Sequence, residues 1–261
     1  MKKDFEKKYH DVETDHWWFK SRRRYLIDLL KNAPKNSRIL DIGCSSGVFL
    51  KDLEGLGFSN DNLFGIDISD KAITNAKANG LSNTFVMDAQ DITLKEKFDI
   101  IVASDCLEHL QDDKKAIQNW KSLLKTGGTM YVFVPAFQSL WSYHDVVNMH
   151  FRRYTNPELR KKILAENLQI IQSGYWNFFL FLPIYSFRKF TSTFQKNKTG
   201  ESDISIGNRF INKMLLQLLI FENNLLKFAR FPFGISTFCV AKKRSWLFFH
   251  WLLEQPNRLS G

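Results

Sequence analysis

The stretch ILDIGCSSG, residues 39–47, decides the fold of this chain. It begins as a buried strand and ends where a helical pattern starts, so its glycines lie at a strand-to-helix turn. Gly43 and Gly47 let the backbone turn sharply and approach a bound molecule where a Cβ would collide. A pyrophosphate loop would read G-x-G-x-x-G, whereas the spacing here is D-x-G-x-x-x-G, with Asp41 as the acidic residue ahead of the first glycine. This carboxylate favours a ligand that carries an ammonium and a sulfonium.

Alternating strand and helix patterns surround this loop. From Arg38 to Ala136, short β-branched runs alternate with helical stretches. The alternation predicts right-handed crossovers and a parallel sheet covered by helices on both faces. After a loop rich in His, Arg and aromatic residues, a strand is expected over 168–177 and a last strand over 234–243. Residues 179–233 then form an apolar and basic insertion before the last strand.

Two further carboxylates follow the next strands of the predicted sheet. Asp67 ends the second strand, where an acidic side chain can accept both ribose hydroxyls of a nucleoside. Asp88 ends the third strand, where it can accept from an adenine amino group. Asp also favours strand-to-helix turns for structural reasons, which is the alternative for each residue alone. Their order along the chain favours a purine nucleoside at the carboxyl edge of the sheet.

At this point the sequence resembles the class I S-adenosylmethionine-dependent methyltransferases, over residues 36–136 and 235–243. The motifs that match are LDIGCSSG, FGIDIS, MDAQD, FDIIVASDCLEHL and LKTGGTMYVFVPA. The resemblance implies a Rossmann-like, doubly wound and mostly parallel sheet with an antiparallel last strand. It also implies that S-adenosylmethionine is bound by Asp41, Gly43, Cys44, Gly47, Asp67, Ile68, Asp88, Ala89, Ser104 and Asp105. Glu108 and His109 match the family pattern too, with a role in starting a helix as the alternative.

Segments on both sides of this core resemble a bacterial and archaeal subfamily associated with surface-glycan and lipid-linked sugar genes. The first is HWWF at residues 16–19, followed by three arginines at 22–24. The second lies in residues 140–155 and resembles H-D-x-x-x-G-H-x-R-R-Y-T, with Met149 where glycine is usual. The helical pattern that follows HWWF predicts a lid helix packed on the core. A sharper alternative is that Arg22 or an aromatic residue closes over the cofactor.

The loop at 140–155 contains candidates for acceptor chemistry. His144 or His150, with Asp145 to orient one of them, could remove a hydroxyl proton near neutral pH. Arg152 and Arg153, with the adjacent Tyr154, are the predicted substrate-binding residues, because guanidinium groups hold phosphate or carboxylate. The alternative is that these residues pin the loop to the sheet. No metal site is predicted.

Composition limits the remaining possibilities. The 261 residues are 44% hydrophobic and 25% charged, which suits a folded domain. Three dispersed cysteines and no apolar leader predict a cytoplasmic protein. Net charge is +4 over residues 1–35, −5 over 36–149 and +11 over 150–261. The basic second half suggests an anionic partner or solvated helix faces.

We therefore predict a lid region at 1–35, a methyltransferase domain at 36–243 and a C-terminal tail at 244–261. Cations followed by the apolar block at 246–253 predict peripheral attachment to a membrane, a subunit contact, contact with an apolar substrate, or burial on the core. Residues 215–221 and 225–231 have the apolar spacing of packed helices. The leading function is methylation of a small-molecule, sugar or lipid-linked acceptor. The alternatives are an RNA methyltransferase, for which no nucleic-acid-binding motif is found, and a non-catalytic cofactor-binding subunit.

Overall fold

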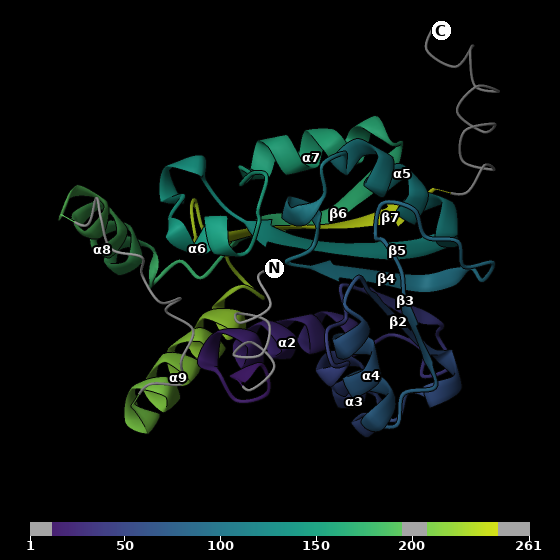
Figure 1. The fold of residues 1–261 in the computed structure, drawn as a ribbon. Helices are drawn as coiled ribbons and strands as arrows, with labels where there is room; N and C mark the ends of the chain where they lie inside the picture. Colours follow the sequence, from purple (N-terminus) through teal and green to yellow (C-terminus); the bar gives the residue numbers. More distant parts are fainter. Residues whose placement is uncertain (1–11, 195–207, 245–261) are drawn as a thin grey trace, which may run out of the picture.

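The computed structural model describes residues 12–194 and 208–244, which fold around one sheet (Figure 1). The sheet has seven strands in the order β3-β2-β1-β4-β5-β7-β6. Strands β1 to β5 are parallel to one another, whereas β7 is antiparallel to both β5 and β6. The predicted Rossmann-like sheet with an antiparallel last strand is therefore confirmed. The strands are β1 Ile39–Ile42, β2 Leu63–Asp67, β3 Asn83–Val86, β4 Phe98–Ser104, β5 Leu124–Pro135, β6 Leu168–Trp176 and β7 Ser236–Lys243.

Helices cover both faces of the sheet (Figure 1). Helices α5 and α7 lie on one face, while α2, α3, α4 and α9 lie on the other. The helices are α2 Trp17–Leu30, α3 Val48–Gly55, α4 Asp70–Ala78, α5 Asp113–Leu123, α6 Tyr143–Val147, α7 Asn156–Ala165, α8 Phe181–Phe194 and α9 Arg209–Leu225. Short 3-10 turns are η1 Asn60–Asn62, η2 Leu107–His109 and η3 Gln138–Leu140. None of the helices in residues 12–194 and 208–244 is both long and apolar enough to cross a membrane.

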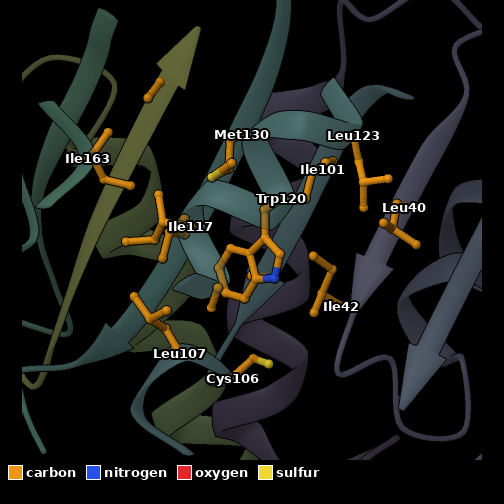
Figure 2. Close-up of a cluster of buried hydrophobic side chains, with 14 of the residues drawn as sticks. Leu40, Ile42, Ile101, Cys106, Leu107, Ile117, Trp120, Leu123, Met130 and Ile163 are labelled. Atoms are coloured by element: carbon orange, nitrogen blue, oxygen red, sulfur yellow. The ribbon is translucent and has the colours of Figure 1, made fainter. Parts of the chain in front are cut away.

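Each face of the sheet has its own hydrophobic core. On the α5 side, the indole of Trp120 is fully buried among Leu107, Ile117 and neighbouring aliphatic side chains (Figure 2). Its Nε1 donates to the Ala89 carbonyl at 2.8 Å, so the largest side chain of this core has no unpaired donor. This bond ties the loop after β3 to α5. The core therefore fixes the strand ends on which the functional residues lie.

The opposite core attaches the two chain regions outside the central fold. Tyr25 of α2 packs edge-on against Phe133 and Phe238. Helix α9 buries Glu222, whose carboxylate accepts backbone N–H groups of residues 177–179, and Asn223, which bonds Trp176. The predicted insertion at 179–233 contains α8 and α9, which lie between β6 and β7 in the chain. The predicted tail lies outside the described residues, apart from Arg244.

Candidate functional site

The predicted cofactor residues gather at one edge of the sheet. Strands β1 to β4 are parallel, and the carboxyl ends of parallel strands share an edge. Asp41 lies within β1 and Asp67 ends β2, while Asp88 follows β3 and Asp105 follows β4. The residues that lie at or just beyond this edge are Asp41, Gly43, Cys44, Gly47, Asp67, Ile68, Asp88, Ala89, Ser104 and Asp105. The sheet thus brings together every residue of the predicted cofactor set.

The glycine loop has the geometry that its sequence predicts. Gly43 and Gly47 have φ angles of +77° and +76°, a region that L side chains rarely adopt. At Gly47 a Cβ would also collide with the Leu81 side chain. The N–H groups of Gly43 and Cys44 donate to the Ile66 carbonyl at 2.8 and 2.9 Å, which fastens the loop to β2. These hydrogen bonds therefore fix the position of the loop at the edge of the sheet.

Asp67 is held in place by the turns on both sides of it. Its Oδ2 accepts the Ser45 N–H at 3.0 Å, and its Oδ1 accepts the Ser69 N–H at 2.9 Å. Backbone N–H groups from the glycine loop and from the turn before α4 thus fix the direction of this carboxylate. The carboxylate is only half-buried. Its predicted ribose role is compatible with these contacts.

Asp41 is buried beside Asp67, and both its burial and this neighbouring charge affect its pKa. Burial, with a smaller contribution from the charge of Asp67, raises the pKa of Asp41 to about 7. A neutral Asp41 cannot attract an ammonium group electrostatically. Below pH 7, affinity of the free protein for S-adenosylhomocysteine should therefore fall by up to about tenfold per pH unit. Calorimetry between pH 5.5 and 7.5 would measure this change.

The variant Asp41→Asn provides the control for that pH dependence. It should bind S-adenosylhomocysteine more weakly than the parent at pH 7.5, with an affinity that changes little over the same range. A parent protein whose affinity is constant from pH 5.5 to 7.5 would contradict the assignment of Asp41 to the ammonium group.

Arg22 brings the N-terminal helix to the same edge. Its guanidinium is buried, lies 4.3 Å from the centre of the Trp176 ring, and donates to Ser236 Oγ at 2.7 Å. Its Nη1 lies 3.3 Å from Asp105 Oδ2 and 3.4 Å from Ser104 Oγ. Asp105 itself has a φ of +53°. Arg22 therefore anchors α2 to the residues expected to border the sulfonium, and a lid role for this helix stays a prediction.

The loop after β5 is built around a buried carboxylate. Asp145 accepts from Arg153 Nε at 2.7 Å and Nη2 at 3.0 Å, and its Oδ1 lies 2.9 Å from His150 Nδ1. Burial alone would raise the pKa of Asp145, but the His150 hydrogen bond and the Arg153 charge hold it well below its usual range. Asp145 thus orients His150, whereas sequence left open which histidine it would meet. His144 is partly buried, and this desolvation lowers its pKa to about 4.

The three predicted substrate-binding residues make contacts within the protein. Arg153 is buried and also donates to the Ala136 carbonyl at 3.1 Å. Arg152 pairs with Asp113 at 2.9 Å, and the buried Tyr154 donates to the same carboxylate at 3.0 Å. Such contacts are expected if the residues attach the loop to the sheet, which is the alternative to substrate binding. Substrate binding by the three residues stays a prediction, and the partly exposed Arg152 is the most accessible of them.

A second cluster, formed by Glu108, His109 and His150, lies beside this loop. The sequence motif contains only the first two of these residues. Glu108 and His109 are in η2, after β4, and the ring centres of His109 and His150 are 4.5 Å apart. Glu108 is completely buried. The motif matched Glu108 and His109 but gave no partner for them, because His150 comes from a distant segment. Only the fold brings the three together.

The chain matches the family model of the methyltransferase domain over residues 15–173. It belongs to that family. Two curated relatives are ubiquinone biosynthesis O-methyltransferases. The relative from Colwellia psychrerythraea is 32% identical over 43% of this chain and 47% of its own length, and that from Glaesserella parasuis is 33% identical over 47% and 55%. The chain thus spans about half the length of these relatives.

Solved methyltransferase structures share the fold. The N-methyltransferase NodS of Bradyrhizobium japonicum, in complex with S-adenosylhomocysteine, has a TM-score of 0.55 at 17% identity and covers 89% of this chain and 91% of its own. Magnesium protoporphyrin IX methyltransferase of Synechocystis has a TM-score of 0.57 at 14% identity, with 93% and 95% covered. The family and the fold class predicted from the motifs are therefore confirmed.

Proposed function

We propose that this methyltransferase-family protein transfers the methyl group of S-adenosylmethionine to an oxygen of a small-molecule, sugar or lipid-linked acceptor. The observation that carries the proposal is the placement of Asp41, Asp67 and Asp88 on three neighbouring strand ends, in the order that the ammonium, ribose and adenine require. The curated relatives named as O-methyltransferases support oxygen as the acceptor atom. The relatives' name also supports a small molecule over a nucleic acid.

The residues of the protein chiefly position the acceptor, because the sulfonium is already activated for displacement. An oxygen acceptor keeps a proton, which a base must remove. His150 is the stronger candidate of the two predicted bases, since the Asp145 hydrogen bond fixes its ring orientation. His144 lies in the same loop, and its ring centre is 6.5 Å from that of His150.

Transfer of radiolabelled methyl groups into separated lipid, glycan and RNA fractions tests the proposed function. Label is expected in the lipid or glycan fraction with the parent protein and absent with Asp67→Ala. Label in RNA would instead support the nucleic-acid alternative. Intact binding of S-adenosylhomocysteine with no label in any fraction would support a non-catalytic cofactor-binding subunit.

We also propose that the protein is cytoplasmic and attaches to the inner membrane face through α9. The outward face of this helix exposes Phe210, Met214 and Phe221, which lie in one stripe at helical spacing. The opposite face buries Leu219 and Asn223. The net charge of +11 over residues 150–261 complements anionic lipids. An apolar stripe on a basic region is typical of helices that lie in a membrane interface.

Flotation with anionic vesicles tests this attachment. The parent protein should float with the vesicles and do so less at high salt, and Phe210→Ser with Phe221→Ser should reduce the floating fraction several-fold. Leu164→Ser is the matched control, because Leu164 is an exposed apolar residue on α7, on the other side of the sheet. Equal flotation of all three proteins, or none by the parent, would contradict the α9 assignment.

A further inference from the structure

Three potential metal ligands meet at the junction of η2 and the loop after α6. They are Glu108, His109 and His150, and their ligating atoms all lie within 4.8 Å of one another. Glu108 and His109 come from the turn that follows β4, next to the predicted cofactor edge. His150 is carried by the loop that Asp145 organises. Two imidazoles and one carboxylate form a ligand set that binds first-row divalent cations.

Glu108 has no partner for its carboxylate. Its side chain is completely buried, and neither Oε1 nor Oε2 has a hydrogen-bond partner within the described part of the chain. A buried carboxylate without a partner is costly to the folded state. A bound cation would supply the partner that this carboxylate lacks.

His150 is arranged as metal-binding histidines usually are. Its Nδ1 faces Asp145 Oδ1 at 2.9 Å, and the Asp145 carboxylate is itself held by Arg153. An Nδ1–H donated to a carboxylate leaves the Nε2 lone pair free for a metal and increases its basicity. From the sequence, Asp145 is predicted to orient a histidine that acts as a base. The same contact also fits a partner that orients a metal ligand.

His109 is held beside His150 by its packing. The two rings lie edge to face with their centres 4.5 Å apart. The ring of His109 also makes a hydrogen bond with the backbone of Asn148, in the loop before His150. An imidazole has two ring nitrogens, so a contact at one leaves the other for a metal. The ligating atoms of the three side chains therefore lie close enough together to share one ion.

We propose that Glu108, His109 and His150 bind a divalent transition-metal ion such as Zn²⁺ or Co²⁺. Protein ligands lie about 2.0–2.2 Å from such an ion, so binding would draw the three side chains together by roughly an ångström. Three protein ligands leave at least one position open. Resting on the proposed function, this position would take the acceptor hydroxyl and lower its pKa, so that its proton passes to water; His150 would then act as a metal ligand in place of the base.

Metal binding can be measured without any methyl transfer. Full-length protein is stripped with a chelator and titrated with Co²⁺, which is followed by its visible absorption, and with Zn²⁺ by calorimetry. One ion per chain is expected, with a rise in Tm on binding. Glu108→Gln, His109→Ala and His150→Ala should each weaken binding by about 100-fold or more. His144→Gln, in the same loop but outside the cluster, should bind as the parent does.

Glu108→Gln separates a loss of metal binding from a loss of folding. It replaces an unpartnered buried carboxyl group by a neutral amide of nearly the same shape, so the metal-free variant should be at least as stable as the metal-free parent. A parent that binds neither ion at millimolar concentration, or cluster variants that bind as tightly as the parent, would overturn the proposal. Binding of S-adenosylhomocysteine is measured on the same samples. Its retention after metal binding fails would leave the proposed function standing, whereas its loss in the parent would count against that function alone.

Discussion

Asp67→Ala is expected to weaken the binding of S-adenosylhomocysteine by about 100-fold or more. The substitution removes a charged acceptor for two ribose hydroxyls, and each such hydrogen bond contributes about 1.5–3 kcal/mol. It also removes the acceptor of the Ser45 and Ser69 N–H groups, which lie 3.0 and 2.9 Å from the carboxylate. Both effects act on the cofactor edge. Calorimetry on the purified variant measures the loss.

Asp88→Ala is the matched comparison for Asp67→Ala. Asp88 is exposed, and its Oδ1 accepts the Gln90 N–H at 2.8 Å. The expected loss is about tenfold, because water can replace a single contact to an adenine amino group. Circular dichroism would establish that both variants are folded. Unchanged affinity in a folded Asp67→Ala protein would overturn the cofactor assignment.

Arg153→Ala should lower the free energy of unfolding by about 3–5 kcal/mol, because it leaves the buried Asp145 carboxylate without its cation. Asp145 and Arg153 are both buried, and their two hydrogen bonds measure 2.7 and 3.0 Å. The substitution also frees the Ala136 carbonyl at the end of β5. Urea unfolding of parent and variant measures the difference.

Arg152→Ala is the control for Arg153→Ala. Arg152 is partly exposed, and its partner Asp113 also contacts Lys162 and Tyr154, so the carboxylate stays paired. The expected loss of stability is about 1 kcal/mol. If Arg153→Ala were as stable as Arg152→Ala, the buried pair would not be what holds this loop.

The cofactor edge could be predicted because it depends mostly on local sequence. Alternating strands and helices determine a parallel sheet, and each strand end carries its own functional residue: Asp41, Asp67 and Asp88. Parallel strands place their carboxyl ends together, so the order of the motifs was enough to predict one site. The antiparallel β7 followed from the family resemblance. Hydrogen bonding along neighbouring strands then fixes these positions within narrow limits.

Helix α9 shows where periodicity alone was insufficient. The apolar residues at 215–221 and 225–231 predicted packed helices, but the structure has one helix that ends at Leu225. Apolar residues lie on more than one side of this helix, so spacing could not decide which side faces the core. Glu222 and Asn223 decide it, because their buried hydrogen bonds to residues 176–179 turn Phe210 and Phe221 outward.

The sequence by itself determined the family, the sheet and the strand ends that form the cofactor edge, because these depend on short-range patterns and on the geometry common to all parallel sheets. Only the tertiary structure decided that Asp145 meets His150 and Arg153, and that Glu108 lies buried beside His109 and His150. Those contacts join segments far apart in the chain. Residue type and spacing cannot specify them, since the loop after β5 acquires its position only by packing its buried charges against the rest of the fold.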